Sequence, residues 1–178
     1  MLLTRIDLLD DLLQQHEDAI GIDFTAYRNH AYRVLNFCTA LAPAQPERSA
    51  KLAIAAAFHD LGIWTARTFD YLPPSEALAR DYLESQGLQH WSSEVIGMIA
   101  QHHKITRCPP GTPVLVEVFR RADWVDVSHG LLTYGLPRTL LREVFAAFPD
   151  AGFHKRLLQL SAKRLFTHPL NPLPMMRR

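Results

Sequence analysis

The sequence predicts an all-α protein, a single bundle of about seven or eight helices. Apolar residues recur at spacings of three and four through most of the 178 residues, which is the period of an amphipathic helix. Prolines, glycines and small polar residues interrupt these runs at intervals that suit helix ends. Apolar and polar residues nowhere alternate over a stretch long enough to build a sheet.

The composition is that of an ordinary globular domain. With 178 residues, 48% hydrophobic content and a formal net charge of +1, the chain can bury a sizeable core, and we expect one domain over residues 1–178. It has no basic, apolar leader and no apolar run of membrane-spanning length, so we expect no membrane partner and a cytoplasmic location. Cys38 and Cys108 are too few for a disulfide scaffold and are interpreted as structural thiols.

Three helices are expected before residue 62. The first covers roughly residues 4–19. The second follows Asp23, which is expected to cap its free amides, and runs to about Leu41. The third begins near Pro46, a residue that suits a first helical turn, and ends at His59 and Asp60.

The middle of the chain is predicted to hold an irregular segment and two helices. Residues 64–74 lack helical periodicity and are expected to be irregular. Ser75 is expected to cap a fourth helix that closes at Gly87. Ser92 or Ser93 then caps a fifth helix, which ends at a pair of histidines.

The last third is also predicted to be helical. A turn over residues 108–111 precedes Pro113, which opens a long apolar helix. Two further helices are expected within residues 137–167. The tail, residues 168–178, is rich in proline and is expected to be extended.

The adjacent residues His59 and Asp60 are the most informative feature of the chain. They end an apolar helical run that begins at Leu52, and Leu61 and Gly62 follow directly. Burial of an imidazole and a carboxylate is unfavourable unless a partner replaces their lost hydration, and a divalent cation suits both groups. We interpret the pair as one half of a metal site.

His30 and Asp123 are the best candidates for the other half. At helical spacing, His30 shares a face with Val34, and Asp123 shares one with Phe119, so both side chains are expected to point inward. Two histidines and two aspartates would then converge from three helices. Asp126, three residues after Asp123 and on nearly the same face, is the alternative fourth ligand.

This order of residues resembles the HD superfamily of metal-dependent phosphohydrolases, whose signature is His, then His-Asp, then Asp, all on helices. The resemblance covers roughly residues 24–130. An arginine three residues after the first histidine, Gly62 two residues after the pair, and an Ala-Asp sequence within an apolar helix make the match more specific. The resemblance implies an HD-type helical fold.

In the family, the four signature residues bind one divalent ion, and they correspond here to His30, His59, Asp60 and Asp123. A mixed set of imidazoles and carboxylates suits Mn²⁺, Fe²⁺, Co²⁺, Ni²⁺ or Zn²⁺ and, less comfortably, Mg²⁺. Such an ion acidifies a bound water and can also bind a phosphate oxygen. The resemblance therefore implies hydrolysis of a phosphate mono- or diester, for example of a nucleotide, with Asp60 as both ligand and proton acceptor.

Two-metal members of the family use further histidines. His102 and His103 resemble one such element, at the end of a helix that lines the same pocket. The second element would lie at the start of the preceding helix, where this sequence offers Glu76, an oxygen ligand, in place of histidine. We therefore expect one tightly held ion and a second site that is weak or absent.

A phosphoryl substrate also needs positive charge near the ion. Arg33, one turn after His30, and Lys104, beside the paired histidines, lead, and Arg67 and Arg28 are further candidates. We expect a small phosphorylated molecule as the partner. Basic residues outnumber acidic ones after Pro137, but they occur in pairs along helices, which is typical of a solvated face and predicts no nucleic-acid polymer as partner.

Two other functions fit the same residues. Some HD-fold proteins hold two irons and oxidise small molecules, although they need the additional histidines. A regulatory or binding module could hold a metal without turnover.

The remaining histidines are not accompanied by other candidate ligands in this way and are expected on surfaces or at helix ends. They are His16, His90, His129, His154 and His168.

Overall fold

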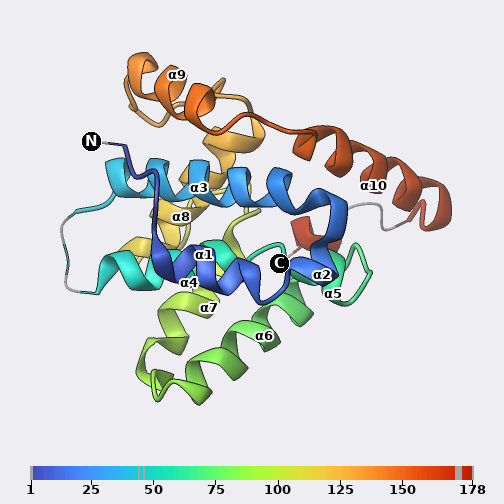
Figure 1. Cartoon of the computed structure of the whole chain (residues 1–178), viewed down its shortest axis with the longest axis horizontal. Coiled ribbons are helices and arrows are strands. Elements are labelled where there is room, and N and C mark those ends of the chain that lie inside the picture. Colours follow the sequence, from blue (N-terminus) through green and yellow to red (C-terminus); the bar gives the residue numbers. More distant parts are fainter. Residues whose placement is uncertain (1, 44, 46, 171–173, 178) are drawn as a thin grey trace.

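Figure 1 shows the computed structural model of the chain, which describes residues 2–43, 45, 47–170 and 174–177. These residues form helices and turns with no strand among them, which confirms the all-α prediction. Two short helices, α2 (Glu17–Ile20) and α5 (Gly62–Thr65), have four residues each. The longer α-helices among the described residues are α1 (Asp7–Gln14), α3 (Phe24–Leu41), α4 (Arg48–Phe58), α6 (Leu72–Ser85), α7 (Ser92–Gln101), α8 (Val114–Val127), α9 (Arg138–Ala147) and α10 (Phe153–Thr167).

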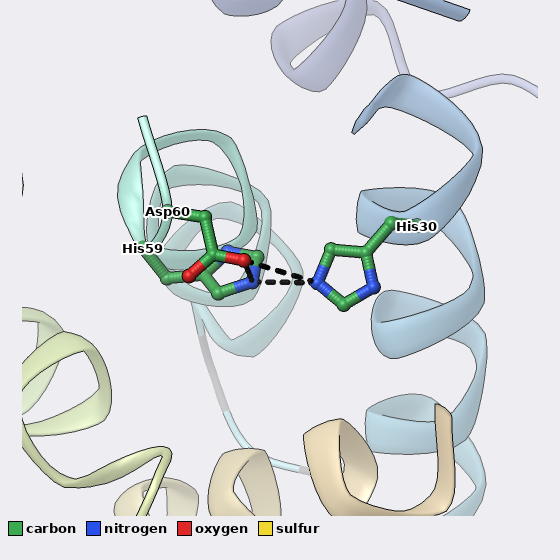
Figure 2. A group of neighbouring side chains, drawn as sticks. All are labelled: His30, His59 and Asp60. Atoms are coloured by element: carbon green, nitrogen blue, oxygen red, sulfur yellow. Dashed lines mark hydrogen bonds and ion pairs between the residues drawn. The ribbon is translucent and has the colours of Figure 1, made fainter. Parts of the chain in front are cut away.

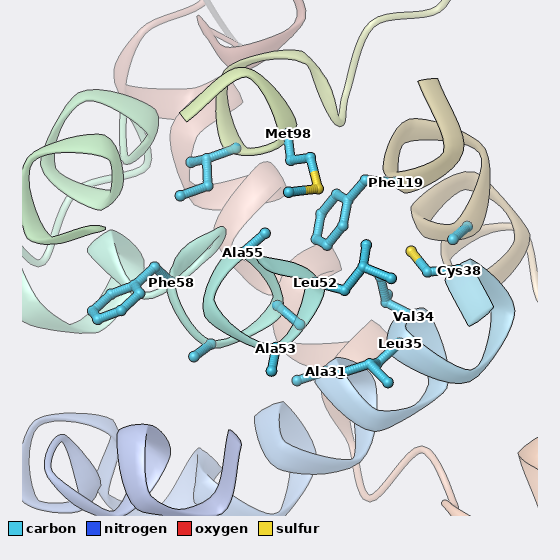
Figure 3. Packing of buried hydrophobic residues seen from close by; sticks show 14 of the residues in the cluster. Ala31, Val34, Leu35, Cys38, Leu52, Ala53, Ala55, Phe58, Met98 and Phe119 are labelled. Carbon is cyan, nitrogen blue, oxygen red and sulfur yellow. The ribbon is translucent and has the colours of Figure 1, made fainter. Parts of the chain in front are cut away.

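The core is built around α3 and α4. Helix α3 packs against α4, α8, α9 and α10, and α4 also contacts α1, α6, α7 and α8. Ala53, Ala55, Ala56 and Ala57 are all buried on α4, and their small side chains let neighbouring helices approach closely (Figure 3). The helices that carry His30, the His59–Asp60 pair and Asp123 therefore meet in the middle of the molecule.

The single helix expected over residues 4–19 is two helices in the structure. α1 ends at Gln14, and after Gln15 and His16 the chain continues as α2. The amide of His16 donates to the carbonyl of Leu13, a bond that tightens the last turn. The break lets α2 contact α3 and α5, which a straight helix continuing from α1 would not reach.

Two expected helix caps do not form. Asp23 directly precedes α3 but makes no side-chain cap bond; its carboxylate accepts from the indole Nε1 of Trp64 at 2.9 Å and pairs with Arg156 at 3.0 Å. α7 begins at Ser92 without a side-chain cap, after a 3₁₀ turn over Gln89–Trp91. Long-range contacts have taken the carboxylate of Asp23, which sequence alone would assign to the nearest helix end.

The segment after the His59–Asp60 pair is more ordered than expected. Its first residues form α5, and α6 begins already at Leu72, with prolines in its first turn. Ser75 is therefore inside α6 and does not cap it; its buried hydroxyl accepts from the amide of Gly62 at 2.9 Å. This bond ties the start of α6 to the chain directly after the predicted metal ligands.

Some of the predicted helix ends agree with the structure and others do not. α3 ends at Leu41 and α9 and α10 lie within residues 137–167, as expected. The start of α4 was predicted near Pro46, which lies outside the described residues. The tail is not simply extended: Pro174–Arg177 form a 3₁₀ helix, and Met175 is buried. Burial of this apolar side chain offsets the cost of ordering a proline-rich end.

None of the helices in the described part of the chain is both long enough and apolar enough to cross a membrane.

Candidate metal centre

Three helices bring two histidines and two aspartates to one buried point. His59 and Asp60 directly follow α4, His30 lies in α3, and Asp123 lies in α8. All four residues are 2% exposed or less. Figure 2 shows His30 facing the pair His59 and Asp60 across the gap between α3 and α4.

The facing atoms of these residues are close to one another. Nε2 of His30 is 2.8 Å from Nε2 of His59 and 3.6 Å from Oδ2 of Asp60. Oδ1 of Asp123 is 3.6 Å from the same nitrogen of His30 and 4.0 Å from that of His59. Two ligand atoms that each lie about 2.0–2.1 Å from one ion, in directions at a right angle to each other, are about 3 Å apart. One cation therefore fits among these four atoms after small adjustments of the side chains.

The hydrogen bonds of the histidines fix which nitrogen faces inward. Nδ1 of His59 lies 3.0 Å from the carbonyl oxygen of Ala56, and Nδ1 of His30 lies 2.6 Å from a carboxylate oxygen of Asp126. A carbonyl and a carboxylate only accept, so each Nδ1 carries the proton and donates it. The two Nε2 atoms therefore present lone pairs to each other, an arrangement that needs a proton or a metal cation between them.

Asp60 also belongs to a second group of possible ligands, together with His102 and His103. Oδ1 of Asp60 lies 3.3 Å from Nε2 of His102. Both atoms are buried without a hydrogen-bond partner among the described residues, although such orphans are costly. Nδ1 of His102 donates to the carbonyl of Ile99 at 2.7 Å, so its Nε2 also offers a lone pair. A divalent ion would satisfy both orphaned atoms.

Glu76 does not join the two ligand groups that share Asp60. It lies half-buried in the second turn of α6. The structure thus gathers six of the predicted metal and pocket residues, which are His30, His59, Asp60, His102, His103 and Asp123, and leaves Glu76 outside.

Asp126 and Arg33 lie behind His30. Asp126 accepts the Nδ1 proton of His30 and forms a two-pronged ion pair with Arg33, with nitrogen to oxygen distances of 2.5 and 2.9 Å. The guanidinium also donates to the carbonyls of Phe148 and Pro149. Arg33 is completely buried, so it does not take the substrate-facing position expected for it. Instead it holds the carboxylate that orients His30.

Comparison with protein families agrees with this arrangement. The family model of the HD domain matches residues 27–128, more than half of the chain, including all four signature residues. The chain belongs to the HD-domain family. No match was found among curated proteins or among solved structures.

A tyrosine from the segment after the His59–Asp60 pair also lies at the HD site. Tyr71 is 1% exposed, and its hydroxyl is hydrogen-bonded to Nε2 of His103. Nδ1 of His103 lies 3.8 Å from Oδ2 of Asp123. His103 is the most exposed of the gathered residues, with a side chain 16% exposed. Tyr71 therefore covers the side on which the cluster comes closest to solvent.

Two aromatic rings close the site on other sides, and helical periodicity did not identify them. Phe153, the first residue of α10, stacks on His30 with ring centroids 4.0 Å apart. The ring of Tyr27 lies 6.0 Å from that of His59, and its hydroxyl donates to the carbonyl of Ala57 at 2.9 Å. These rings exclude water and strengthen the electrostatic interactions among the ligands.

The charges within the HD site depend on burial and on neighbours. Burial lowers the pKa of His59 to about 3 and raises the pKa of Asp123 to about 7. Burial alone would also raise the pKa of Asp60, but His59 and His102 lower it well below its usual range. The metal-free site therefore holds a neutral His59 and an ionised Asp60, both in the form that binds a metal.

The other positively charged side chains proposed to meet the substrate differ in their exposure to solvent. Arg28 pairs with Asp10 at 2.8 Å and stacks on Tyr32. Lys104 follows α7 and is half-buried; its backbone carbonyl accepts from Arg120 at 3.1 Å. Arg67 lines an open pocket of about 500 Å³, and it is the candidate best placed to meet an anion from solution.

Proposed function

We propose that this protein is a metal-dependent phosphohydrolase that acts on a phosphate mono- or diester. The observation that carries the proposal is the pair of inward-facing lone pairs on His30 and His59, whose Nε2 atoms are 2.8 Å apart with both Nδ1 protons already donated elsewhere. With Asp60 and Asp123 beside them, these nitrogens suit a divalent ion of the first transition row. Membership of the HD family supports the same reaction class.

A divalent ion bound there supplies an acidified water and polarises a phosphoryl oxygen. Asp60 is the residue best placed to take a proton from the attacking water, because it stays ionised in the buried site and its Oδ1 has no hydrogen-bond donor. His102 faces that oxygen at 3.3 Å and could pass the proton on. Asp126 keeps His30 in the correct tautomer throughout.

Substrate access requires a local movement, because the four signature residues are almost completely buried. The pocket that Arg67 lines also contains Trp64, Arg156 and Lys163. The ring of Trp64 lies 4.7 Å from that of Tyr27, which in turn contacts His59. The pocket is thus separated from the cluster by two aromatic side chains, and its positive charge would attract a phosphate ester towards the site.

Metal analysis and hydrolysis test this function together. The chain as purified should contain a divalent metal, and p-nitrophenyl phosphate or bis(p-nitrophenyl) phosphate should be hydrolysed in the presence of Mn²⁺ or Co²⁺. His59→Ala and Asp123→Ala should each lose metal and activity with the helical circular dichroism retained. Metal bound with no turnover of either ester or of a nucleotide panel would instead support a binding module.

Arg67 gives a finer test of substrate approach. Arg67→Ala should raise KM several-fold and leave kcat and metal content nearly unchanged, since the side chain would attract the ester without touching the reacting atoms. Arg107→Ala is a matched control, because Arg107 lines a different pocket. Equal KM values for the two variants would contradict the proposed route.

A second candidate is supported by the other ligand group. His102 and His103 share Asp60 with the signature histidines, so two ions could bind side by side, as an iron-dependent oxygenase of this fold requires. Two irons per chain, together with oxygen consumption, would favour this function. One ion per chain at the shared cluster would favour hydrolysis with a single metal.

A further inference from the structure

A second cluster of possible metal ligands lies outside the HD site. One ligand atom each from His129, Asp150 and His154 lies within 4.8 Å of the other two. The rings of the two histidines face each other with centroids 3.8 Å apart. His129 is exposed, and the other two residues are half-buried, so water can complete the coordination of an ion there.

The hydrogen bonds of His154 make this cluster more than a surface ion pair. Its Nε2 lies 3.2 Å from the backbone carbonyl of Asp126, which can only accept, so Nε2 carries the proton. In the neutral ring, Nδ1 then presents its lone pair to the carboxylate Oδ1 of Asp150, with which it is in contact. Two acceptors in contact need a proton or a cation between them, and the neighbouring imidazole of His129 supplies a further nitrogen ligand.

We propose that His129, Asp150 and His154 form a second, solvent-accessible site for a transition-metal ion. Two imidazoles and one carboxylate suit Zn²⁺, Ni²⁺, Co²⁺ or Cu²⁺ better than Mg²⁺ or Ca²⁺. We call these three residues the outer cluster, and the ligands gathered around Asp60 the inner cluster. With fewer and more exposed ligands, the outer cluster binds its ion more weakly than the inner one.

The outer cluster joins two elements that position His30. The carbonyl of Asp126 accepts from His154 and also from the backbone amide of His129 at 2.8 Å, while the side chain of Asp126 orients His30. Phe153, adjacent to His154, stacks on the imidazole ring of His30. An ion in the outer cluster would therefore clamp the start of α10 to the end of α8, directly behind an inner ligand.

Metal titration of the stripped protein tests the proposal without reference to activity. Equilibrium dialysis against Zn²⁺ and Ni²⁺, with metal counted by mass spectrometry, should show tight binding and one additional weaker ion per chain. His129→Asn should remove only the weaker ion. Asparagine tolerates the left-handed backbone that His129 adopts, with φ of 50°, so the change removes the ligand and keeps the turn.

Controls separate the two clusters. His59→Ala should weaken the tight class and leave the weaker ion bound. His90 is an exposed histidine of the 3₁₀ turn Gln89–Trp91, and His90→Asn should change neither. His154→Gln should act like His129→Asn. The proposal is overturned if the wild type binds no ion beyond those lost in His59→Ala, or if His129→Asn and His154→Gln both retain the weaker ion.

A structural readout tests the clamp. Binding of the weaker ion should slow hydrogen exchange of the backbone amides at the start of α10 and the end of α8, and it should do so in His59→Ala but not in His129→Asn. Exchange rates that are equal with and without the ion would show that it does not join the two helices.

Discussion

The inner and outer clusters use the same residue types in opposite surroundings. The inner cluster draws its ligands from helices far apart in sequence and buries them almost completely. The outer cluster draws on two segments that α9 separates in the sequence but that meet in space, the turn after α8 and the start of α10, and it leaves its ligands open to water. The inner ligands therefore depend on the whole fold, whereas the outer ligands depend on one local contact.

The two clusters also differ in how their charges are compensated. Asp126, behind the inner cluster, pairs with an arginine and a histidine that are both completely buried. Asp150, in the outer cluster, pairs with His154 and accepts from the amide of Gly152 while it remains half-exposed. Unpaired charge is far more costly in the first setting. Equivalent substitutions should therefore have very different effects on stability.

The largest expected effect follows from removing the carboxylate of Asp126. Asp126→Ala leaves the guanidinium of Arg33 buried without its counter-ion and Nδ1 of His30 without an acceptor. The free energy of unfolding should fall by about 3–5 kcal/mol, the usual cost of breaking a buried pair, and the inner cluster should lose metal. Urea denaturation of the metal-free protein measures the first effect, and metal counting measures the second.

Asp150→Ala is the matched change at the outer cluster. It removes a half-exposed ion pair and the acceptor of backbone amides near the start of α10, so we expect a loss of about 1 kcal/mol. Equal losses in Asp126→Ala and Asp150→Ala would contradict the distinction between the two clusters.

The pH dependence of stability should distinguish Asp123 from Asp150. Burial raises the pKa of Asp123 to about 7 in the metal-free protein. The native state then binds more protons at this residue than the unfolded state between about pH 4 and pH 7. The contribution of Asp123 to stability is present at low pH and is lost as the pH rises through this range.

Asp150 should behave in the opposite way. Burial alone would raise its pKa, but His154 lowers it, so its contribution is present above about pH 4 and is lost as the pH falls further. Denaturation of metal-free Asp123→Asn should therefore reveal a stability gain over the wild type that grows from pH 4 to pH 7, by a few kcal/mol at most. Asp150→Asn should show no such gain, and a gain that shrinks with rising pH in Asp123→Asn would contradict the assignment.

The sequence allowed the inner cluster to be located because its central ligands are adjacent. His59 and Asp60 end an apolar helix, and the helical phases of His30 and Asp123 direct both towards the core, where the structure brings them together. The choice between Asp123 and Asp126 could not be made in this way, because residues three apart share a helical face. In the structure they contact different nitrogens of the same imidazole ring.

The features that the sequence did not predict depend on contacts between distant segments. Arg33 lies one turn from His30, a spacing compatible with either a substrate contact or a buried pair, and only the position of Asp126 distinguishes the two. His129 and His154 belong to different helical segments, and the turn that brings His129 into place has a left-handed residue that no periodicity predicts. Sequence patterns report the faces of single helices, whereas both features depend on how helix ends meet.

Two glycines, one beside each cluster, allow a comparison of close packing with backbone strain. A methyl group on Gly62 would clash with the backbone carbonyl of Tyr71 and come within 3.0 Å of Pro74. Gly62→Ala should therefore cost about 1–3 kcal/mol and shift Tyr71 away from His103. Gly152 has open space around it but a φ of +95°, so Gly152→Ala should cost about 1–2 kcal/mol through backbone strain alone.

The two glycine variants are best distinguished by metal exchange. If Tyr71 covers the inner cluster, its displacement in Gly62→Ala should speed the loss of inner metal to a chelator, and Gly152→Ala should leave that rate unchanged. Tyr71→Phe keeps the ring and removes only the hydroxyl that bonds His103, so its rate should lie between those of wild type and Gly62→Ala. A rate in Gly62→Ala equal to that of the wild type would mean that the inner ion leaves on a side that Tyr71 does not cover.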